Sequence, residues 1–339
     1  MATFKKLALV LLLALVAGVL LTAFRELPQK DEGKTYYAVV FLNRGHVTGG
    51  TQSNVGLFTC PFGDTIWTNI YRRNLLSFGF GIWKGTSGTR YYLAAGNGLH
   101  RSVDGTKSWR VLTDWHTEEI LSVAPDPIDS AVIYVSTPFG VFKSTDEGRH
   151  WDKKMSGMKK WFVKKVVIDV NNRQKLFAVA EEDVYRSTDS GEHWEPLHAG
   201  LTDVQTFAQD PAFPQHLLAG GEDDGIRLSL DGGRTWQAAR GVPKASFYAT
   251  AFSPDGHIAY AGGFKTGLWT STDDGVSWKL LWQNPDVEAI ATIYVHKNDP
   301  KHLMVGTTGQ GIYESRDAGT TWRQAGLLGC QVRQIELYP

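Results

Sequence analysis

The stretch STDEGRHW, from Ser144 to Trp151, recurs in near copies along the chain. Four other segments keep the spelling S-x-D-x-G-x-x-W, namely STDSGEHW, SLDGGRTW, STDDGVSW and SRDAGTTW, which start at Ser187, Ser229, Ser271 and Ser315. A sixth segment, SVDGTKSW from Ser102, has its glycine one place early. We refer to each of these segments as a box. A feature repeated at a regular interval predicts a fold built from repeated units.

The interval between the boxes indicates the kind of unit. Aligning GLFTCPFGDTIW (56–67) with GLWTSTDDGVSW (267–278) reveals a seventh, decayed copy, in which Cys60 replaces the serine and Phe62 the aspartate. The last residues of the seven copies are separated by 42 to 44 residues: Trp67, Trp109, Trp151, Trp194, Trp236, Trp278 and Trp322. This period is typical of a four-stranded propeller blade, so seven copies predict seven blades.

Each period contains enough β-prone runs for four strands. In one unit these are ILSVAPDP (120–127), VIYVST (132–137) and GVFKS (140–144), and a few strand residues follow the tryptophan. The box is therefore expected on the hairpin between the third and fourth strands, counted outward from the ring axis.

The two chain ends predict how the ring closes. The first unit begins at YYAVVFL (36–42), which matches a second strand, and the last residues, VRQIELYP (332–339), match a first strand. The C-terminal strand is expected to complete the N-terminal blade, so that no inner sheet edge stays unpaired. The predicted fold class is all-β: a seven-bladed β-propeller of four-stranded antiparallel blades, preceded by one N-terminal transmembrane helix.

The residue types in the box suit a structural role. An aspartate in a hairpin accepts backbone N–H groups, and a glycine adopts positive φ. A tryptophan can pack between sheets while its indole N–H finds a polar partner. If the aspartates were acids or metal ligands instead, one ring would hold six identical sites. We therefore assign structural roles to Ser102, Asp104, Trp109, Ser144, Asp146, Gly148, Trp151, Ser187, Asp189, Gly191, Trp194, Ser229, Asp231, Gly233, Trp236, Ser271, Asp273, Gly275, Trp278, Ser315, Asp317, Gly319 and Trp322.

The spelling S-x-D-x-G-x-x-W resembles the Asp-box, or BNR, repeat over residues 36–339. That superfamily includes sialidases, some endo-glucanases, sortilin-type receptors and the photosystem II assembly and stability factors. A single seven-bladed, membrane-proximal domain of this length is most similar to the photosystem II assembly and stability factor-like group. This resemblance implies a non-enzymatic role in building or stabilising a membrane complex.

Composition excludes a strong preference for nucleic acid. The chain has 339 residues, with 35 basic and 35 acidic side chains, so no overall field attracts a polyanion. Its 12 tryptophans and 36 glycines, with 42% hydrophobic residues, are typical of a turn-rich globular β protein.

The N-terminus predicts a membrane anchor. Leu7 to Phe24 reads LALVLLLALVAGVLLTAF, an uncharged run just long enough to span a bilayer as a helix. Lys5 and Lys6 favour a cytoplasmic N-terminus, which puts the propeller on the periplasmic or lumenal side. The expected domains are an anchor at 1–24, a linker at 25–35 and the propeller at 36–339. A cleaved signal peptide remains the alternative.

The geometry of the first blade predicts where the linker attaches and how the two cysteines lie. Strand pairing starts at Tyr36 on the face that carries the boxes, so the linker is expected to approach that face.

Cys60 and Cys330 fall on strands separated by another strand, at roughly twice the ~4.8 Å strand spacing. This separation favours two buried thiols over a disulfide.

No residue pattern predicts catalysis or a cofactor. A sialidase would need three clustered arginines, a Tyr/Glu pair and an RIP-like motif, whereas the nearest text here is FRELP (24–28). Glu118 and Glu119 are adjacent, so on a strand they point to opposite sides and make no acid/base pair. The box lacks the ligand order of a calcium loop, and the ten histidines show no metal-ligand spacing. We expect no enzyme activity, no metal and no cofactor.

The remaining signal is a basic and aromatic surface opposite the boxes. KKMSGMKKWFVKK (153–165) places six lysines around two aromatic residues, and cation-plus-aromatic patches are favoured at interfaces. A solvated lysine run is the alternative. The candidate partner-binding residues are Arg72, Arg73, Trp115, His116, Lys159, Lys160, Trp161 and Arg240.

Together these features predict a membrane-anchored, extracytoplasmic propeller that acts as an assembly factor or accessory subunit of an integral membrane complex. The resemblance adds a photosynthetic reaction centre as the plausible complex. The alternatives are an exported, sialidase-like glycoside hydrolase and a soluble glycan- or peptide-binding receptor.

Overall fold

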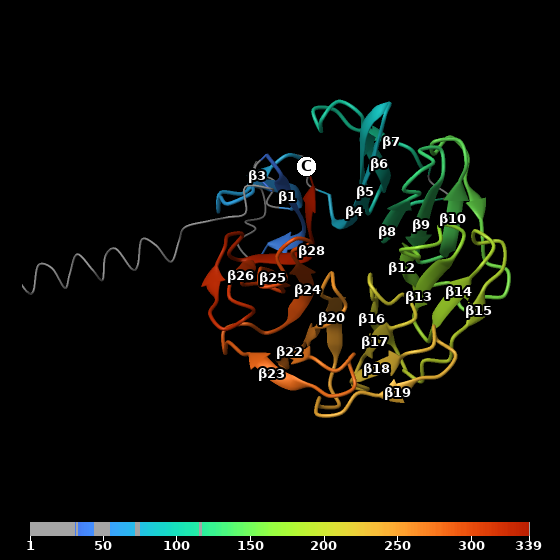
Figure 1. Cartoon of the computed structure of the whole chain (residues 1–339). Helices are drawn as coiled ribbons and strands as arrows, with labels where there is room; N and C mark the ends of the chain where they lie inside the picture. The colour runs from blue at the N-terminus through green and yellow to red at the C-terminus, as the bar shows by residue number, and fades with distance from the viewer. Residues whose placement is uncertain (1–30, 32, 44–54, 72–74, 115–116, 339) are drawn as a thin grey trace, which may run out of the picture.

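The computed structural model describes residues 31, 33–43, 55–71, 75–114 and 117–338. They form seven four-stranded antiparallel sheets arranged around an axis, which confirms the predicted seven-bladed propeller (Figure 1). The predicted anchor at 1–24 and most of the linker lie outside the described residues. Within the described part of the chain, no helix is long and apolar enough to cross a membrane.

The blades follow one another along the chain, and the strands of each are given from the axis outward. Blade 1 consists of β28 (Cys330–Tyr338), β1 (Thr35–Asn43), β2 (Gly56–Pro61) and β3 (Thr68–Asn69). Blade 2 consists of β4 (Ser77–Gly85), β5 (Gly88–Ala95), β6 (Gly98–Ser102) and β7 (Arg110–Val111). Blade 3 consists of β8 (Ser122–Pro125), β9 (Ile133–Thr137), β10 (Gly140–Ser144) and β11 (Asp152–Lys153).

The other four blades repeat this order. Blade 4 consists of β12 (Val163–Ile168), β13 (Leu176–Ala180), β14 (Val184–Ser187) and β15 (Glu195–Pro196). Blade 5 consists of β16 (Val204–Gln209), β17 (Leu217–Gly221), β18 (Ile226–Ser229) and β19 (Gln237–Ala238). Blade 6 consists of β20 (Phe247–Phe252), β21 (Ala259–Gly263), β22 (Gly267–Ser271) and β23 (Lys279–Trp282). Blade 7 consists of β24 (Ile290–Val295), β25 (Leu303–Thr307), β26 (Ile312–Ser315) and β27 (Arg323–Gln324).

The second strand of each blade forms the core. Every residue of β9, β13, β17, β21 and β25 is buried, because neighbouring blades cover both faces of these central strands. Their sequences are accordingly continuous apolar and small-residue runs, such as LFAVA in β13. Burial on both faces of a strand favours such runs over strict alternation of polar and apolar residues.

The ring closes as predicted, through the two ends of the chain. β1 pairs with β28 from Thr35 opposite Tyr338 to Asn43 opposite Cys330. The C-terminal strand is thus the inner strand of the N-terminal blade, and β28 lies beside β1 in Figure 1. This pairing satisfies the inner edge of β1, which would otherwise be open to pairing with another chain.

The two cysteines are free and buried, as expected. Cys60 lies opposite Tyr36 at one end of β1, whereas Cys330 lies opposite Asn43 at the other end. Burial raises the pKa of the Cys60 thiol to about 12 and that of Cys330 to about 11. Both side chains therefore act as small apolar groups of the core.

The antiparallel order gives the ring two faces. Each inner strand begins on one face of the ring, which we call the entry face. The connections between second and third strands lie on the same face. The boxes and the turns that follow the inner strands lie on the opposite face, the box face.

Candidate functional site

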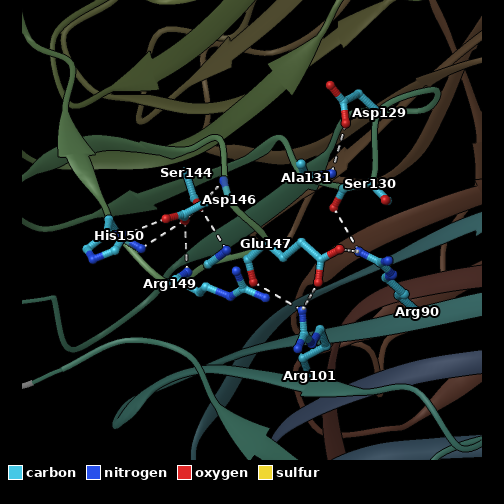
Figure 2. A network of polar contacts seen from close by, with 11 residues as sticks. Arg90, Arg101, Asp129, Ser130, Ala131, Ser144, Asp146, Glu147, Arg149 and His150 are labelled. Carbon is cyan, nitrogen blue, oxygen red and sulfur yellow. Dashed lines mark hydrogen bonds and ion pairs between the residues drawn. The ribbon is translucent and has the colours of Figure 1, made fainter.

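The box between β10 and β11 shows why its residue types recur (Figure 2). The Oγ of Ser144 donates to Asp146 Oδ1 at 2.9 Å and accepts the backbone N–H of Gly148 at 2.8 Å. Asp146 Oδ1 also accepts the backbone N–H groups of Arg149 and His150, at 3.0 and 2.9 Å. One serine and one aspartate thus satisfy the donors of a tight hairpin.

The same bonds recur in the other boxes and keep their carboxylates ionised. Hydrogen bonds from Ser108 lower the pKa of Asp104 to about 2, and those from Thr235 lower the pKa of Asp231 to about 2. An aspartate with so low a pKa is ionised at neutral pH, and its oxygens already accept hydrogen bonds, so it is a poor proton donor. In the described residues, no group of three or more His, Cys, Asp and Glu side chains could hold a metal ion.

The box also joins neighbouring blades. In Figure 2, Glu147 forms ion pairs with two arginines of blade 2. Arg90 Nη1 lies 3.0 Å from Glu147 Oε1, and Arg101 Nη1 lies 3.4 Å from Glu147 Oε2. Arg101 Nη1 also donates to the carbonyl of Glu147 at 3.1 Å. This network clamps blade 2 to the box of blade 3.

The box tryptophans provide a second inter-blade contact. The indole N–H of Trp194 donates to Lys154 O at 3.1 Å, and that of Trp236 donates to Leu197 O at 3.1 Å, each in the preceding blade. Trp67 and Trp151 make the same kind of bond, whereas Trp278 and Trp322 donate to carbonyls of their own boxes. Among the seven box tryptophans, only the Trp109 indole lacks a hydrogen-bond partner in the described structure.

The entry face carries most of the exposed aromatic side chains. Of the five exposed Phe and Trp residues in the described chain, four are on this face: Phe139, Trp161, Phe162 and Phe264. Trp161 is 63% exposed, and Lys153 Nζ lies 5.1 Å from the centre of its ring. Lys265 Nζ lies 4.9 Å from the ring of Phe264. Aromatic surface beside a cation is typical of protein-binding faces.

Three of the predicted partner-binding residues lie together there. Lys159, Lys160 and Trp161 lead directly into β12, and all three are exposed. Lys160 Nζ lies 3.6 Å from Glu182 Oε2, in the connection between β13 and β14. The predicted Arg72, Arg73, Trp115 and His116 lie outside the described residues.

Arg240 does not join this group. Its backbone N–H donates to Val276 O, and its carbonyl accepts the N–H of Trp278, both at 2.9 Å. Its backbone therefore runs beside a box of the next blade. We predicted Arg240 on the entry face because it follows the outer strand β19. In the structure, the segment after β19 first runs along the box of blade 6 before it reaches the entry face.

A set of inner-strand positions escaped the sequence analysis. Six inner strands carry a bulge near their start, where one residue is skipped in the pairing: Phe78, Lys164, Gln205, Tyr248, Ala291 and Arg333. In blade 3 the equivalent residue is Leu121, whose backbone N–H donates to Ser136 O at 2.8 Å. None of the seven residues is buried, although the residue before each of them is. A bulge re-aims its side chain, so these seven form a ring at the entry end of the inner strands, which we call the bulge ring.

One side of the bulge ring is acidic and internally paired. Gln205 Nε2 donates to Asp203 Oδ2 at 2.8 Å and to Glu222 Oε2 at 2.9 Å. Lys164 Nζ bonds to the same Asp203 carboxylate and, at 2.9 Å, to Val204 O. Lys164 and Asp203 thus form an ion pair across the junction of blades 4 and 5.

A family model describes this propeller. The model of the DUF6242 beta propeller domain matches residues 130–329, more than half of the chain. The chain belongs to this family. The match covers blades 4 to 7 and most of blade 3, and the structure extends the same architecture to blades 1 and 2.

Solved structures share the fold of this DUF6242 propeller at low sequence identity. An ancestral GH74 enzyme superposes with a TM-score of 0.58 at 15% identity, covering 77% of this chain and 38% of the enzyme. YCF48 bound to a D1 peptide superposes with a TM-score of 0.58 at 16% identity, covering 77% of this chain and 92% of YCF48. These likenesses show that the chain shares its propeller fold with both proteins.

One curated protein shares a short segment. Vacuolar protein sorting/targeting protein 10 of Sordaria macrospora is 37% identical over 60 residues, which make up 18% of this chain and 4% of that protein. The chain thus spans less than half of the GH74 enzyme and a small part of the sorting protein.

Proposed function

We propose that the propeller is non-enzymatic and binds a protein partner on its entry face, as an assembly factor or accessory subunit of an integral membrane complex. The observation that carries this proposal is the exposed aromatic and lysine cluster at Trp161, with Lys153 over the ring and Lys159 and Lys160 beside it. Burying such aromatic anchors against a partner yields much of the energy of an interface.

The structural neighbours are consistent with protein binding. YCF48 has nearly the size of this chain and was solved with a bound D1 peptide. The sequence resemblance to photosystem II assembly and stability factors extends the proposal to a photosynthetic reaction centre. The predicted helix at 1–24 would hold the propeller at the extracytoplasmic surface of that complex.

The GH74 likeness is one of fold and supplies no reaction for this chain. Its box carboxylates are occupied by hydrogen bonds, and Asp203 near the axis is bound by Lys164 and Gln205. An open depression of about 430 Å³ lies on the entry face between Lys265–Gly267 and Gln283–Glu288. A depression of this size could take up a side chain of a bound partner protein.

Site-specific photo-crosslinking tests the proposal. A photoreactive amino acid replaces Phe139 or Phe264 on the entry face, and Phe213 on the box face serves as the matched control, since it is also an exposed phenylalanine. We expect membrane-protein adducts from the two entry-face positions and none from position 213. Adducts from position 213 alone would contradict the assignment of the binding face.

A further inference from the structure

The box face carries the most exposed aliphatic side chains. Of the four most exposed large apolar residues in the described chain, three lie on this face: Ile128, Ile66 and Val103, which are 72%, 71% and 65% exposed. Ile66 lies in the decayed copy of blade 1, Val103 in the box of blade 2 and Ile128 in the turn after β8 of blade 3. The fourth, Leu328, comes just before β28 on the entry face. Single exposed apolar residues are ordinary, whereas a set on one face indicates a contact surface.

The turns hold these three side chains outward. The backbone N–H of Ile128 donates to Oδ1 of the buried Asp126 at 2.9 Å, and that of Ile66 donates to Asp64 Oδ1 at 3.2 Å. Val103 is the second residue of its box, whose serine and aspartate side chains are joined at 2.8 Å. Because aspartate hydrogen bonds of this kind fix the backbone of a turn, the exposure of the three apolar side chains is built into the fold.

The N-terminal segment reaches the propeller on the same face. Asp31 is fully buried, and its Oδ2 lies 3.2 Å from Nε2 of His296 in the turn after β24. The decayed copy of blade 1 packs on this junction, because the backbone N–H of Phe62 donates to Lys34 O at 2.9 Å. The Phe62 ring also lies 5.5 Å from that of His296, centre to centre. Ile66 belongs to the same copy, so the apolar set begins beside the point where the chain enters the propeller.

The sequence before Asp31 limits what can lie opposite this face. The uncharged apolar run ends at Phe24, and only residues 25–30 separate it from Asp31. Fully extended, this linker reaches at most about 25 Å, whereas a small protein domain is about 30 Å across. With the apolar run in a bilayer, as the proposed function requires, the linker leaves no room for a folded domain between the lipid and the box face beside Asp31.

We propose that the box face of blades 1 to 3 rests on the lipid surface that holds the anchor, with Ile66, Val103 and Ile128 inserted among the headgroups and upper acyl chains. Aliphatic side chains gain free energy when they leave water for that region. The exposed Asp104 carboxylate next to Val103 disfavours anionic lipid, so a lipid without net charge suits this face. This inference rests on the proposed function, because it needs the anchor at 1–24, and it adds the orientation of the propeller on the membrane.

The test labels single positions of the full-length protein in phosphatidylcholine vesicles. The two native cysteines are buried, so an environment-sensitive fluorophore reacts with a cysteine introduced by Ile66→Cys, Val103→Cys or Ile128→Cys. Leu328→Cys on the entry face is the matched control, because Leu328 is an aliphatic residue of similar exposure. Lipids that carry a quencher on the upper acyl chain should quench the three box-face labels, whose emission should also shift to the blue. The label at position 328 should show neither effect.

A second set of variants checks that the apolar side chains cause the contact. Ile66→Asn combined with Val103→Asn should reduce quenching of the label at position 128. Leu42→Asn combined with Leu76→Asn, two exposed leucines on the entry face, should leave that quenching unchanged. Equal effects of the two combinations would overturn the proposal.

The other outcomes of the labelling overturn it as well. Equal quenching at position 328 would mean that no one face of the propeller rests on lipid. An absence of quenching at all four positions would mean that the propeller stands off the bilayer. A box-face signal that appears only as the amount of protein per vesicle rises would identify a second copy of this chain as the occupant.

The outcome is separable from that of the proposed function. Flotation of the vesicles first shows whether residues 7–24 hold the protein on lipid, and protein that does not float would refute the anchor and this inference together. Protein that floats without quenching of the box-face labels refutes this inference alone. Changes at Ile66 and Val103 leave the entry-face cluster at Trp161 intact, so crosslinking of a partner to the entry face does not depend on this result.

Discussion

The Oδ2 of Asp31 lies 3.2 Å from the Nε2 of His296, and this pair joins the segment before β1 to blade 7. Asp31 is fully buried, and its Oδ1 also accepts the side-chain N–H of Asn298 at 3.1 Å. His296 and Asn298 belong to the turn after the inner strand β24, on the box face. The chain therefore reaches the propeller at the box face, as the strand order predicted, and the entry face points away from this attachment.

The burial of His296 predicts acid sensitivity. Burial lowers the pKa of His296 below its usual value of 6.5, with His302 adding to the shift and Asp31 opposing it. The unfolded chain then binds more protons than the folded one, so the free energy of unfolding falls as the pH drops below about 6.5. The melting temperature should be lower at about pH 5.5 than at about pH 7.5. His296→Gln should flatten this dependence, and a parent protein that gains stability on acidification would contradict it.

Thr106 predicts a stabilising substitution. It occupies the fifth position of its box, where the five intact boxes have glycine, and it has a φ of 70°. A β-branched residue in this region is strained by roughly 1–2 kcal/mol, so Thr106→Gly should raise the free energy of unfolding by about 1 kcal/mol. Thr235→Gly is the control, because it removes the Thr235 Oγ1 bond to Asp231 and should destabilise. Denaturant unfolding measures both, and equal signs for the two variants would refute the strain argument.

Gly148 should not tolerate a side chain. Its φ is +84°, and a Cβ there would lie 2.7 Å from Leu112 Cδ1 in the preceding blade. Gly148→Ala is therefore expected to destabilise through both strain and overpacking, by about 1–3 kcal/mol. Gly105→Ala is the matched comparison, because its φ is +69° and no atom lies within 4 Å of the added Cβ. Thermal unfolding should rank Gly148→Ala below Gly105→Ala, and the reverse order would show that Leu112 does not pack as described.

Ser187 should contribute more to stability than Asp189. Ser187 is buried, donates to Asp189 Oδ1 at 2.8 Å and accepts the N–H of Gly191 at 2.9 Å. Ser187→Ala leaves a buried donor unpaired, which costs about 1–3 kcal/mol. Asp189 is exposed, so water can replace part of its bonding in Asp189→Ala. Chemical denaturation gives the free energy of unfolding of both variants. A larger loss in Asp189→Ala than in Ser187→Ala would contradict this account.

The predicted anchor gives a biochemical expectation. Mature protein should retain Leu7 to Phe24 and stay with membranes after a high-salt wash, because a spanning helix is held by burial of apolar side chains. N-terminal sequencing and fractionation make the measurement. A mature chain that starts beyond Arg25 would instead indicate a cleaved signal peptide.

The sequence predicted the architecture well because the box is both local and periodic. Ser, Asp and Gly satisfy a hairpin within eight residues, so their spacing alone gives seven blades and the position of each hairpin. The decayed copy at Cys60 and Phe62 was recognised because its alignment with residues 267–278 keeps the tryptophan. In the structure, Trp67 still donates to Ala325 O of the neighbouring blade, at 2.8 Å. Closure by the C-terminal strand followed from the missing strands at each end.

The binding features were harder to predict because they depend on pairing across strands. The bulge residues include Phe78, Lys164, Ala291 and Arg333, which share no chemistry, so no motif marks their regular spacing. Arg240 was placed wrongly for a related reason. The sequence shows that it follows an outer strand but does not show that this segment bonds to Val276 and Trp278 of the next blade.

Partner association of an entry-face variant tests the central claim most directly. The variant combines Lys159→Glu, Lys160→Glu and Trp161→Ala in the full-length protein, and Phe213→Ala on the box face is the control. Membranes are solubilised in mild detergent, the propeller is purified by an affinity tag, and co-purifying proteins are quantified. We predict unchanged folding for both, loss of the partner from the triple variant and retention by Phe213→Ala. Retention by the triple variant, together with loss when residues 7–24 are replaced by an unrelated helix, would place the contact in the membrane and contradict this account.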